Sequence, residues 1–166
     1  MIIFCRLQRL GLSTVMLDDA KYMELALEQA RRAARHGEVP VGAVLVDKKG
    51  QILARACNMS LRQCDPTAHA EILVLRQGAE RFGSYRLTDT TLYVTIEPCP
   101  MCAGAMVLAR IGRLAYGAED PKAGACGTLY NIVQDPRLNH RLEVSRGILA
   151  EDCRLLIQTF FQKKRK

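Results

Sequence analysis

Two cysteines in the segment TIEPCPMCAGAM, residues 95–106, have a spacing at which side chains can do chemistry together. Cys99 and Cys102 follow a strand-like run and lie at the start of a predicted helix, so both sulfurs face one side of its first turn. Such a pair could be a redox dithiol, because a helix N-terminus lowers the pKa of a thiol. The same helix end equally favours two thiolate ligands of a metal ion. The cysteines alone leave both chemistries open.

The earlier segment DPTAHAE, residues 65–71, favours the metal. It places His69 and Glu71 at the start of another predicted helix, one strand upstream of the cysteines. Helices that enter the same edge of a sheet bring their N-termini together at the carboxyl ends of neighbouring strands, where sites in α/β domains usually lie. One imidazole and two thiolates favour zinc, and three protein ligands with an open fourth position are typical of catalytic zinc. We therefore predict one zinc ion per subunit, bound by His69, Cys99 and Cys102.

Glu71 is expected to act as the general acid and base rather than as a ligand. Its position raises a geometric problem, because residues two apart on a regular helix point about 200° apart. Glu71 therefore has to reach the substrate side of the metal from a direction of its own, which the sequence does not specify.

The elements that position these residues follow from hydrophobic periodicity and turn signals. Helices are predicted over residues 18–37, 67–83, 99–110 and 150–166, and strands over residues 39–47, 51–58, 91–97, 112–120 and 142–147. The first two strands form a hairpin, and strands then alternate with helices. We expect an α/β domain with three layers, α/β/α, around a central mixed five-stranded sheet. Residues 121–141 form a long loop, of a length that is usually functional.

Length and composition indicate that the chain forms a single domain. The chain has 166 residues, 49% of them hydrophobic, which is enough for one core over residues 18–166. Residues 1–17 are predicted to be a disordered N-terminal extension, and the alternative is a transit peptide, which their two arginines and lack of acids before Asp18 weakly resemble. Arg6 and Arg9 interrupt the apolar run before a membrane span or signal-peptide core could form. Seven cysteines at irregular spacing do not indicate a disulfide framework. We expect a reducing compartment, the cytoplasm, and no membrane partner.

The net charge of +7 is concentrated at the ends of the chain. Residues 18–135 carry 14 basic and 14 acidic side chains, whereas residues 136–166 carry eight basic and three acidic ones. The last four residues of the chain are Lys163, Lys164, Arg165 and Lys166. A neutral body with a basic C-terminal segment indicates a polyanionic partner such as nucleic acid, although a solubilising tail has the same charge pattern.

The order of these residues resembles a known family. HAE followed by PCPMC fits the H-x-E…P-C-x-x-C signature of zinc nucleobase deaminases. The segments EVPVGAVLV, DPTAHAEILVLRQG, LYVTIEPCPMCAGAM and RIGRLAYGAED extend the similarity. Over residues 18–166 the chain resembles the bacterial tRNA-specific adenosine deaminases of the zinc-dependent cytidine/deoxycytidylate deaminase superfamily. The resemblance implies a cytidine-deaminase-like fold, a hydrolase and a homodimer.

The resemblance also implies a substrate and its contacts. The family converts the wobble adenosine of the tRNA anticodon stem-loop to inosine, with Glu71 carrying protons from water to the ring nitrogen and to the leaving ammonia. Asn58 matches an asparagine that hydrogen-bonds the nucleoside, and Val41 and Ile96 match the wall of the base pocket. Asp120 matches an acid beside the target ribose. The expected RNA contacts are Asn139 and His140 in the long loop and Phe160, Phe161, Lys163, Lys164 and Arg165 in the last helix.

Three other functions compete with this one. A zinc deaminase of a free base, nucleoside or nucleotide, such as cytosine, guanine or deoxycytidylate, would use the same metal chemistry but would not need the basic C-terminus. A thiol–disulfide oxidoreductase would use Cys99 and Cys102 without His69 or Glu71. A zinc-stabilised RNA-binding module would need no Glu71.

Overall fold

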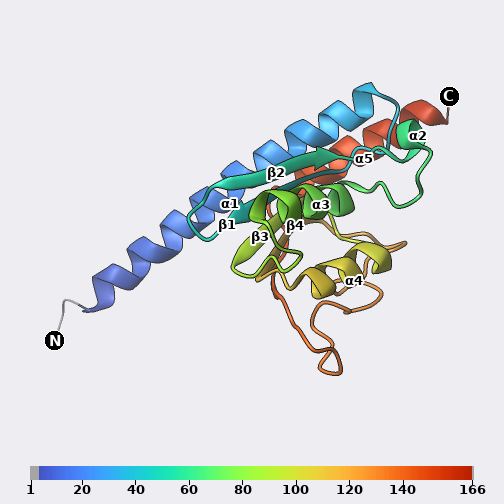
Figure 1. Ribbon diagram of the computed structural model, residues 1–166. Coiled ribbons are helices and arrows are strands. Elements are labelled where there is room, and N and C mark those ends of the chain that lie inside the picture. The colour runs from blue at the N-terminus through green and yellow to red at the C-terminus, as the bar shows by residue number, and fades with distance from the viewer. Residues whose placement is uncertain (1–3, 166) are drawn as a thin grey trace.

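The structure is a computed structural model that describes the backbone of residues 4–165 and the side chains of residues 19–165. Its elements are α1 (Phe4–Arg35), β1 (Gly42–Asp47), β2 (Ile52–Cys57), α2 (Ser60–Gln63), α3 (Ala70–Phe82), β3 (Thr90–Ile96), α4 (Pro100–Ala109), β4 (Arg113–Ala118), β5 (Glu143–Ser145) and α5 (Ala150–Lys164). Figure 1 shows them as helices around one sheet. The short helix α2 is the one element here that the sequence patterns did not predict.

The sheet is mixed and five-stranded, in the order β2-β1-β3-β4-β5. β1 pairs with β2 and with β3 in antiparallel fashion. β3 pairs with β4, and β4 with β5, in parallel fashion. The parallel strands β3 and β4 therefore end at the same edge, where the segments after Ile96 and Ala118 leave the sheet. The predicted fold class is confirmed.

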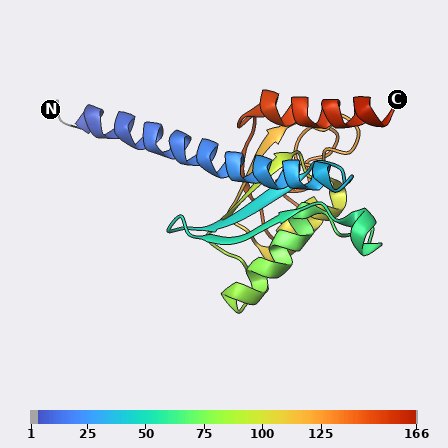
Figure 2. The same cartoon turned by 90° about the horizontal axis from the view of Figure 1, so that it is seen from above.

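Helices cover both faces of this sheet and make two separate cores (Figures 1 and 2). On one face, side chains of α3 and α4 such as Val74 and Met106 pack with Leu92 of β3 and are fully buried. On the other face, Met23 and Ala26 of α1 pack with residues of the central strands and with α5. α1 lies so close to the sheet that a Cβ at Gly42 would collide with the backbone of that helix. The three predicted layers are present.

A buried ion pair fixes α1 to the sheet. The two Arg113 nitrogens lie 2.8 and 2.5 Å from the two Asp19 carboxylate oxygens, and the Tyr93 hydroxyl donates to the same carboxylate at 2.7 Å. Arg113 also donates to Ser145 of β5. The Asp19 carboxylate on α1 thereby connects this helix to β3 and β4 directly and to β5 through Arg113, by charge-assisted hydrogen bonds that are stronger than neutral ones.

The start of α1 differs from the prediction. The sequence indicated a helix from residue 18 and a disordered extension over residues 1–17, but α1 is helical from Phe4. Only residues 1–3 of that predicted extension lie outside the described residues. The physical reason is that residues 4–17 contain no proline and a single glycine, Gly11, so a helix formed at residue 18 continues upstream without a new nucleation step. The first turns of α1 project beyond the sheet (Figures 1 and 2).

The predicted loop is largely confirmed. Between β4 and β5 the chain forms turns and one isolated bridge, Cys126 with Asn131, without a helix or strand. Within residues 4–165, none of the helices combines the length and the apolar composition that spanning a membrane requires.

Candidate active site

Two helix N-termini meet at the carboxyl edge of the sheet and carry the candidate metal ligands. His69 is the N-cap of α3 and Cys99 is the N-cap of α4, each with an extended backbone at φ −71° and −72°. Pro100 opens α4, where its fixed φ suits the first helical turn, and Cys102 follows in that turn. Because β3 ends at Ile96, the segment to Cys99 is short and delivers both cysteines to the edge of the sheet.

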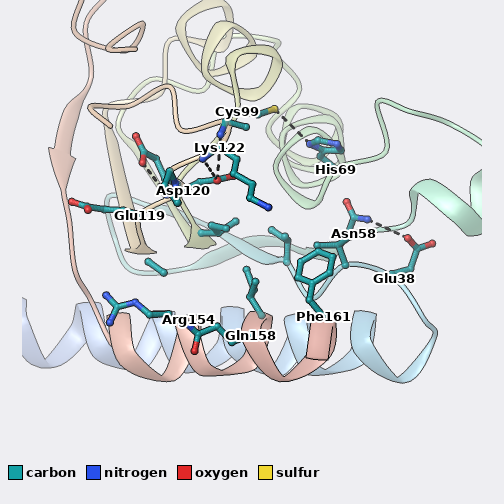
Figure 3. A pocket seen from close by; sticks show the side chains of 18 of the residues that line it. Glu38, Asn58, His69, Cys99, Glu119, Asp120, Lys122, Arg154, Gln158 and Phe161 are labelled. Atoms are coloured by element: carbon teal, nitrogen blue, oxygen red, sulfur yellow. Dashed lines mark hydrogen bonds between the residues drawn. The ribbon is translucent and has the colours of Figure 1, made fainter. Parts of the chain in front are cut away.

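The three side chains lie at distances that suit one metal ion. The His69 Nδ1 atom is 3.7 Å from Cys99 Sγ and 3.6 Å from Cys102 Sγ, and all three donor atoms lie within 4.8 Å of one another (Figure 3). Tetrahedral zinc with ordinary Zn–N and Zn–S bond lengths separates such atoms by about 3.6 Å. In the described part of the chain no other group of histidines, cysteines and acids meets the same criterion. The donor set therefore fits a zinc ion.

Glu71 lies in the first turn of α3, and the geometric problem raised by its spacing from His69 is resolved. His69 is a cap with an extended backbone, so the 100° rotation per residue of a helix does not relate the two side chains. Glu71 is 3% exposed and lines the same pocket as His69 and Cys99. Burial raises the pKa of the Glu71 carboxyl, which brings its proton affinity closer to the range useful for proton transfer.

The two thiols are electrostatically different when no metal is considered. The Cys102 thiol, followed by the His69 ring, lowers the pKa of Cys99 to about 4, and the neighbouring Cys99 and burial raise the pKa of Cys102. Hydrogen bonding to Cys99 raises the pKa of His69. A bound divalent cation would favour the thiolate form of both cysteines and the neutral imidazole, because only those forms are ligands.

A pocket of about 750 Å³ opens beside these ligands, which is within the usual range for small-molecule sites. The structure brings the four predicted substrate contacts, Val41, Asn58, Ile96 and Asp120, to its wall, with Glu71, His69 and Cys99. Asn58 is buried at the end of β2. Asp120 lies in the turn after β4, where its Oδ1 accepts the backbone N–H of Lys122 at 2.8 Å. Residues that are far apart in sequence thus line one cavity.

Two buried carboxylates that sequence reasoning missed also line this pocket. Glu38, between α1 and β1, accepts hydrogen bonds from the Asn58 side chain and from two backbone N–H groups of α2. Glu97, directly after β3, accepts the backbone N–H groups of Asp120, Cys126 and Thr128 and the Thr128 hydroxyl. Burial would raise the pKa of Glu97, but these hydrogen bonds outweigh it and the pKa is lowered. The available signal was an acid inside an otherwise apolar segment, EVPVG for Glu38 and TIEPC for Glu97.

Helix α5 forms the wall of the pocket opposite the candidate ligands His69 and Cys99 (Figure 3). Phe161 is 43% exposed and points from this helix into the pocket, with Arg154 and Lys164 on the same wall. Phe160 instead packs edge to face against Phe161, at a centroid distance of 5.4 Å, and lies under the Lys164 ammonium. Of the predicted RNA contacts on α5, Phe161 and Lys164 reach the pocket, whereas Lys163 and Arg165 are exposed outside it.

The other predicted RNA contacts lie elsewhere. The His140 ring hydrogen-bonds the backbone carbonyl of Ile111 at 2.7 Å, just before β4 begins, and Asn139 is exposed beside it. The pocket lies at the opposite, carboxyl end of β4. Within one chain the structure therefore does not bring Asn139 and His140 to the pocket.

Comparison with known proteins agrees with this geometry. The model of the MafB19-like deaminase family matches residues 17–165. The fold, the histidine and cysteine ligand set and this match define the class: the chain is a member of the MafB19-like deaminases. The redox alternative, which would use the two cysteines alone, has no support from this match.

The individual relatives narrow the class further. A tRNA-specific adenosine deaminase of Haemophilus influenzae is 53% identical over 148 residues, which are 89% of this chain and 86% of that protein. A solved structure from a study of A-to-I editing by tRNA:A34 deaminases has a TM-score of 0.79 at 45% identity, covering 82% of this chain and 98% of that chain. A guanine deaminase of Bacillus subtilis has a TM-score of 0.57 at 39% identity and covers 60% of this chain and 63% of that chain. The chain belongs to the family of tRNA-specific adenosine deaminases.

Proposed function

We propose that the protein converts the wobble adenosine of a tRNA anticodon stem-loop to inosine and ammonia, with one zinc ion held by His69, Cys99 and Cys102. The observation that carries the proposal is the convergence of His69, Cys99 and the buried Glu71 on one wall of a pocket whose other wall is helix α5, with the Cys102 sulfur within 4.8 Å of the other two donor atoms. The names of the similar tRNA deaminases reported above support the same substrate.

Hydrolytic deamination breaks the bond between the ring carbon and its amino group and forms a bond from that carbon to the oxygen of water. When bound, zinc supplies the Lewis acidity that lets a water molecule lose its proton near neutral pH. A Glu71 carboxylate oxygen accepts that proton and donates it to the ring nitrogen beside the reacting carbon. Glu71 then takes the proton of the hydroxyl added to that carbon and passes it to the amino group, which leaves as ammonia while the carbon–oxygen bond becomes a carbonyl. Burial favours the protonated carboxyl between these steps, so Glu71 keeps the proton until the substrate takes it.

The pocket walls orient the nucleoside. Val41 and Ile96 offer apolar surface to the base, and Asn58 offers a buried amide. Asp120 is held by its turn at the pocket wall, where a ribose hydroxyl can donate to it. A base inserted here is removed from the loop stack, which an anticodon loop permits at lower cost than a duplex does.

RNA contacts outside the pocket are proposed for α5. Phe161 lies at the pocket wall with an exposed ring, and a splayed loop base can stack on such a ring. Arg154 and Lys164 lie on the same wall and can meet phosphates, and Lys163 and Arg165 continue the positive charge on the exposed side of the helix. Asn139 and His140 remain predicted contacts, for a part of the RNA that does not enter this pocket.

A homodimer in the cytoplasm is also proposed. Exposed apolar side chains lie on α4 and the long loop, among them Leu108, Leu129 and Tyr130, where a second copy of the chain could bury them. A tRNA substrate and six free cysteines in the described residues are consistent with a reducing compartment. Sedimentation of the purified protein tests the dimer, and a monomer at working concentration would contradict it.

Deamination of a free base is the second candidate, favoured by the similarity to guanine deaminase. The decisive assay uses metal-analysed protein and compares four substrates at equal concentration: a stem-loop with a wobble adenosine, the same stem-loop with that adenosine moved one position, free adenosine and free guanine. Inosine in the first stem-loop alone, with about one zinc per chain, supports the proposal. Release of ammonia from free guanine, with no conversion of adenosine in either stem-loop, would show that the substrate is a free base rather than tRNA.

A further inference from the structure

Glu38 stands out among the buried acids because its contacts lead directly to a predicted substrate contact. Its side chain is 1% exposed, in the segment between α1 and β1. Oε2 accepts the Asn58 Nδ2 amide at 3.1 Å and the backbone N–H of Leu61 at 3.2 Å, and Oε1 accepts the backbone N–H of Arg62 at 2.9 Å. Three donors converge on one carboxylate, which is therefore fixed in position.

The chemistry of the two groups fixes which way the Asn58 amide faces. A carboxylate oxygen beside three N–H donors acts as an acceptor, so the atom of Asn58 that meets Glu38 must be the nitrogen. The amide oxygen then lies on the other side of the Asn58 side chain, away from Glu38 (Figure 3). The backbone adds a second constraint, because the Asn58 N–H donates to the Val41 carbonyl at 3.0 Å.

We propose that Glu38 is a positioning residue that holds the Asn58 amide with its oxygen toward the pocket, so that this oxygen accepts a hydrogen bond from a hydroxyl or amino group of the nucleoside. Without Glu38 the amide can rotate and present its nitrogen, which would face the same substrate donor with another donor. The inference rests on the proposed function, because it assigns a role in nucleoside binding at that same site.

A purely structural role for Glu38 is the competing explanation, since the carboxylate also caps the short helix α2. The two explanations differ in how substitutions combine. If Glu38 acts through Asn58, removing Glu38 has no further effect once the Asn58 amide is absent, because the two residues form one unit. If Glu38 only supports the fold, its effect multiplies with that of Asn58, as for any two independent sites.

The test is a double-mutant cycle on the full-length zinc-loaded protein, with kcat/KM on the wobble-adenosine stem-loop as the readout. Asn58→Ala and Glu38→Gln are each expected to lower kcat/KM at least tenfold, mainly through KM, and the double variant to be no worse than Asn58→Ala within threefold. Asp19→Asn is the matched control: it also removes a buried carboxylate with three hydrogen-bond contacts, but it lies outside the pocket. Its effect is expected to multiply with that of Asn58→Ala.

A rescue experiment gives an independent readout that loss of a helix cap would not produce. Asn58→Asp alone places two carboxylates against each other and is expected to be nearly inactive. In the double variant with Glu38→Gln, the glutamine amide can donate a hydrogen bond to the introduced aspartate, which removes the repulsion. The other aspartate oxygen still faces the pocket, so kcat/KM is expected to be at least tenfold higher than in Asn58→Asp alone. If Glu38→Gln does not fold, Glu38→Asp enters the same cycle, because the shorter acid withdraws from Asn58 while keeping its charge.

The outcomes separate this inference from the proposed function. A parent protein that does not deaminate the stem-loop overturns the proposed function and, with it, this role for Glu38. An active parent in which the Glu38 and Asn58 effects multiply, or in which no rescue occurs, overturns the role of Glu38 alone.

Discussion

Replacing Glu71 by glutamine tests the central chemical assignment, because the amide keeps the volume of the buried carboxyl but cannot shuttle a proton. The proposed metal ligands are His69, Cys99 and Cys102, so zinc content is expected to stay at about one ion per chain. The rate of the chemical step is expected to fall. General acid–base catalysis contributes about 10²- to 10⁴-fold, equivalent to about 2.7 to 5.4 kcal/mol of the barrier.

The structure indicates that the loss should fall at the upper end of this range. The other acids at the pocket are engaged elsewhere or exposed: Glu38 accepts three N–H groups, Glu97 accepts four donors and Asp120 holds its own turn. Glu119 is exposed. None of these carboxylates is both buried and free of such bonds, so none can replace Glu71. We therefore expect a loss of about 10³- to 10⁴-fold.

The assay is single-turnover conversion of adenosine to inosine in a labelled stem-loop, with zinc content and the melting temperature measured on the same samples. Glu80→Gln is the matched control, because Glu80 lies exposed on the same helix and is expected to retain the parent rate. Turnover of Glu71→Gln within tenfold of the parent would refute the proton-transfer role. Loss of zinc from this variant would equally refute it, because Glu71 would then be needed to hold the metal.

Three further predictions address the metal, the RNA surface and the fold. Cys102→Ser is expected to lower zinc occupancy below about a tenth of the parent value in metal analysis, and full occupancy would contradict a ligand role. Changing Lys163 and Arg165 to Gln is expected to reduce the slope of log affinity against log salt by about 0.7 per lost phosphate contact, and an unchanged slope would show that these side chains only solubilise the protein. Asp19→Asn is expected to cost about 1.5 to 3 kcal/mol of unfolding free energy, because it weakens the charge-assisted hydrogen bonds of the partly buried Arg113; urea titration measures this cost. Burial would raise the pKa of Asp19, but the hydrogen bonds from Arg113 and Tyr93 outweigh this effect and lower the pKa. The parent protein should therefore lose this stabilisation as the pH falls through the folded-state pKa of Asp19. The Asp19→Asn variant should not show this loss, because its amide does not titrate.

Much of the fold was predictable because its signals are local. Alternation and turn residues indicated the five strands, and the order of strands and helices indicated three layers. The helix starts predicted at residues 67 and 99 were only approximately right. α4 begins at Pro100, but α3 begins at Ala70, because Asp65 first closes a turn in which its side chain accepts the Thr67 N–H at 2.7 Å. This displacement makes His69 a cap, and the cap geometry lets Glu71 share its pocket.

The hydrogen-bond partners of the buried polar side chains could not be predicted from the sequence, because they depend on contacts between distant segments. Glu38 and Asn58 are twenty residues apart, and nothing in the apolar pattern of EVPVG shows that its acid turns inward to meet an amide at the end of β2. The family resemblance implied an RNA contact for His140, but it did not indicate that the His140 ring hydrogen-bonds the carbonyl of Ile111. Hydrogen-bond partners of this kind are set by the tertiary structure, whereas metal-ligand spacing within a helix turn is visible in the sequence.

The two walls of the pocket differ in chemistry, which explains why the ligand motif alone does not choose the substrate. His69, Glu71, Cys99 and Cys102 come from the starts of α3 and α4, and His69, Glu71 and Cys99 line one side of the pocket. Deamination of any nucleobase by this class of site needs the same metal and the same acid. The opposite wall comes from α5, about fifty residues later, and presents an aromatic ring and cations rather than a closed apolar lid. A free base has no phosphates to meet those charges and no neighbouring base to stack on Phe161. An RNA loop has both, so the choice of tRNA over a free base should lie in α5, while the chemistry lies in α3 and α4.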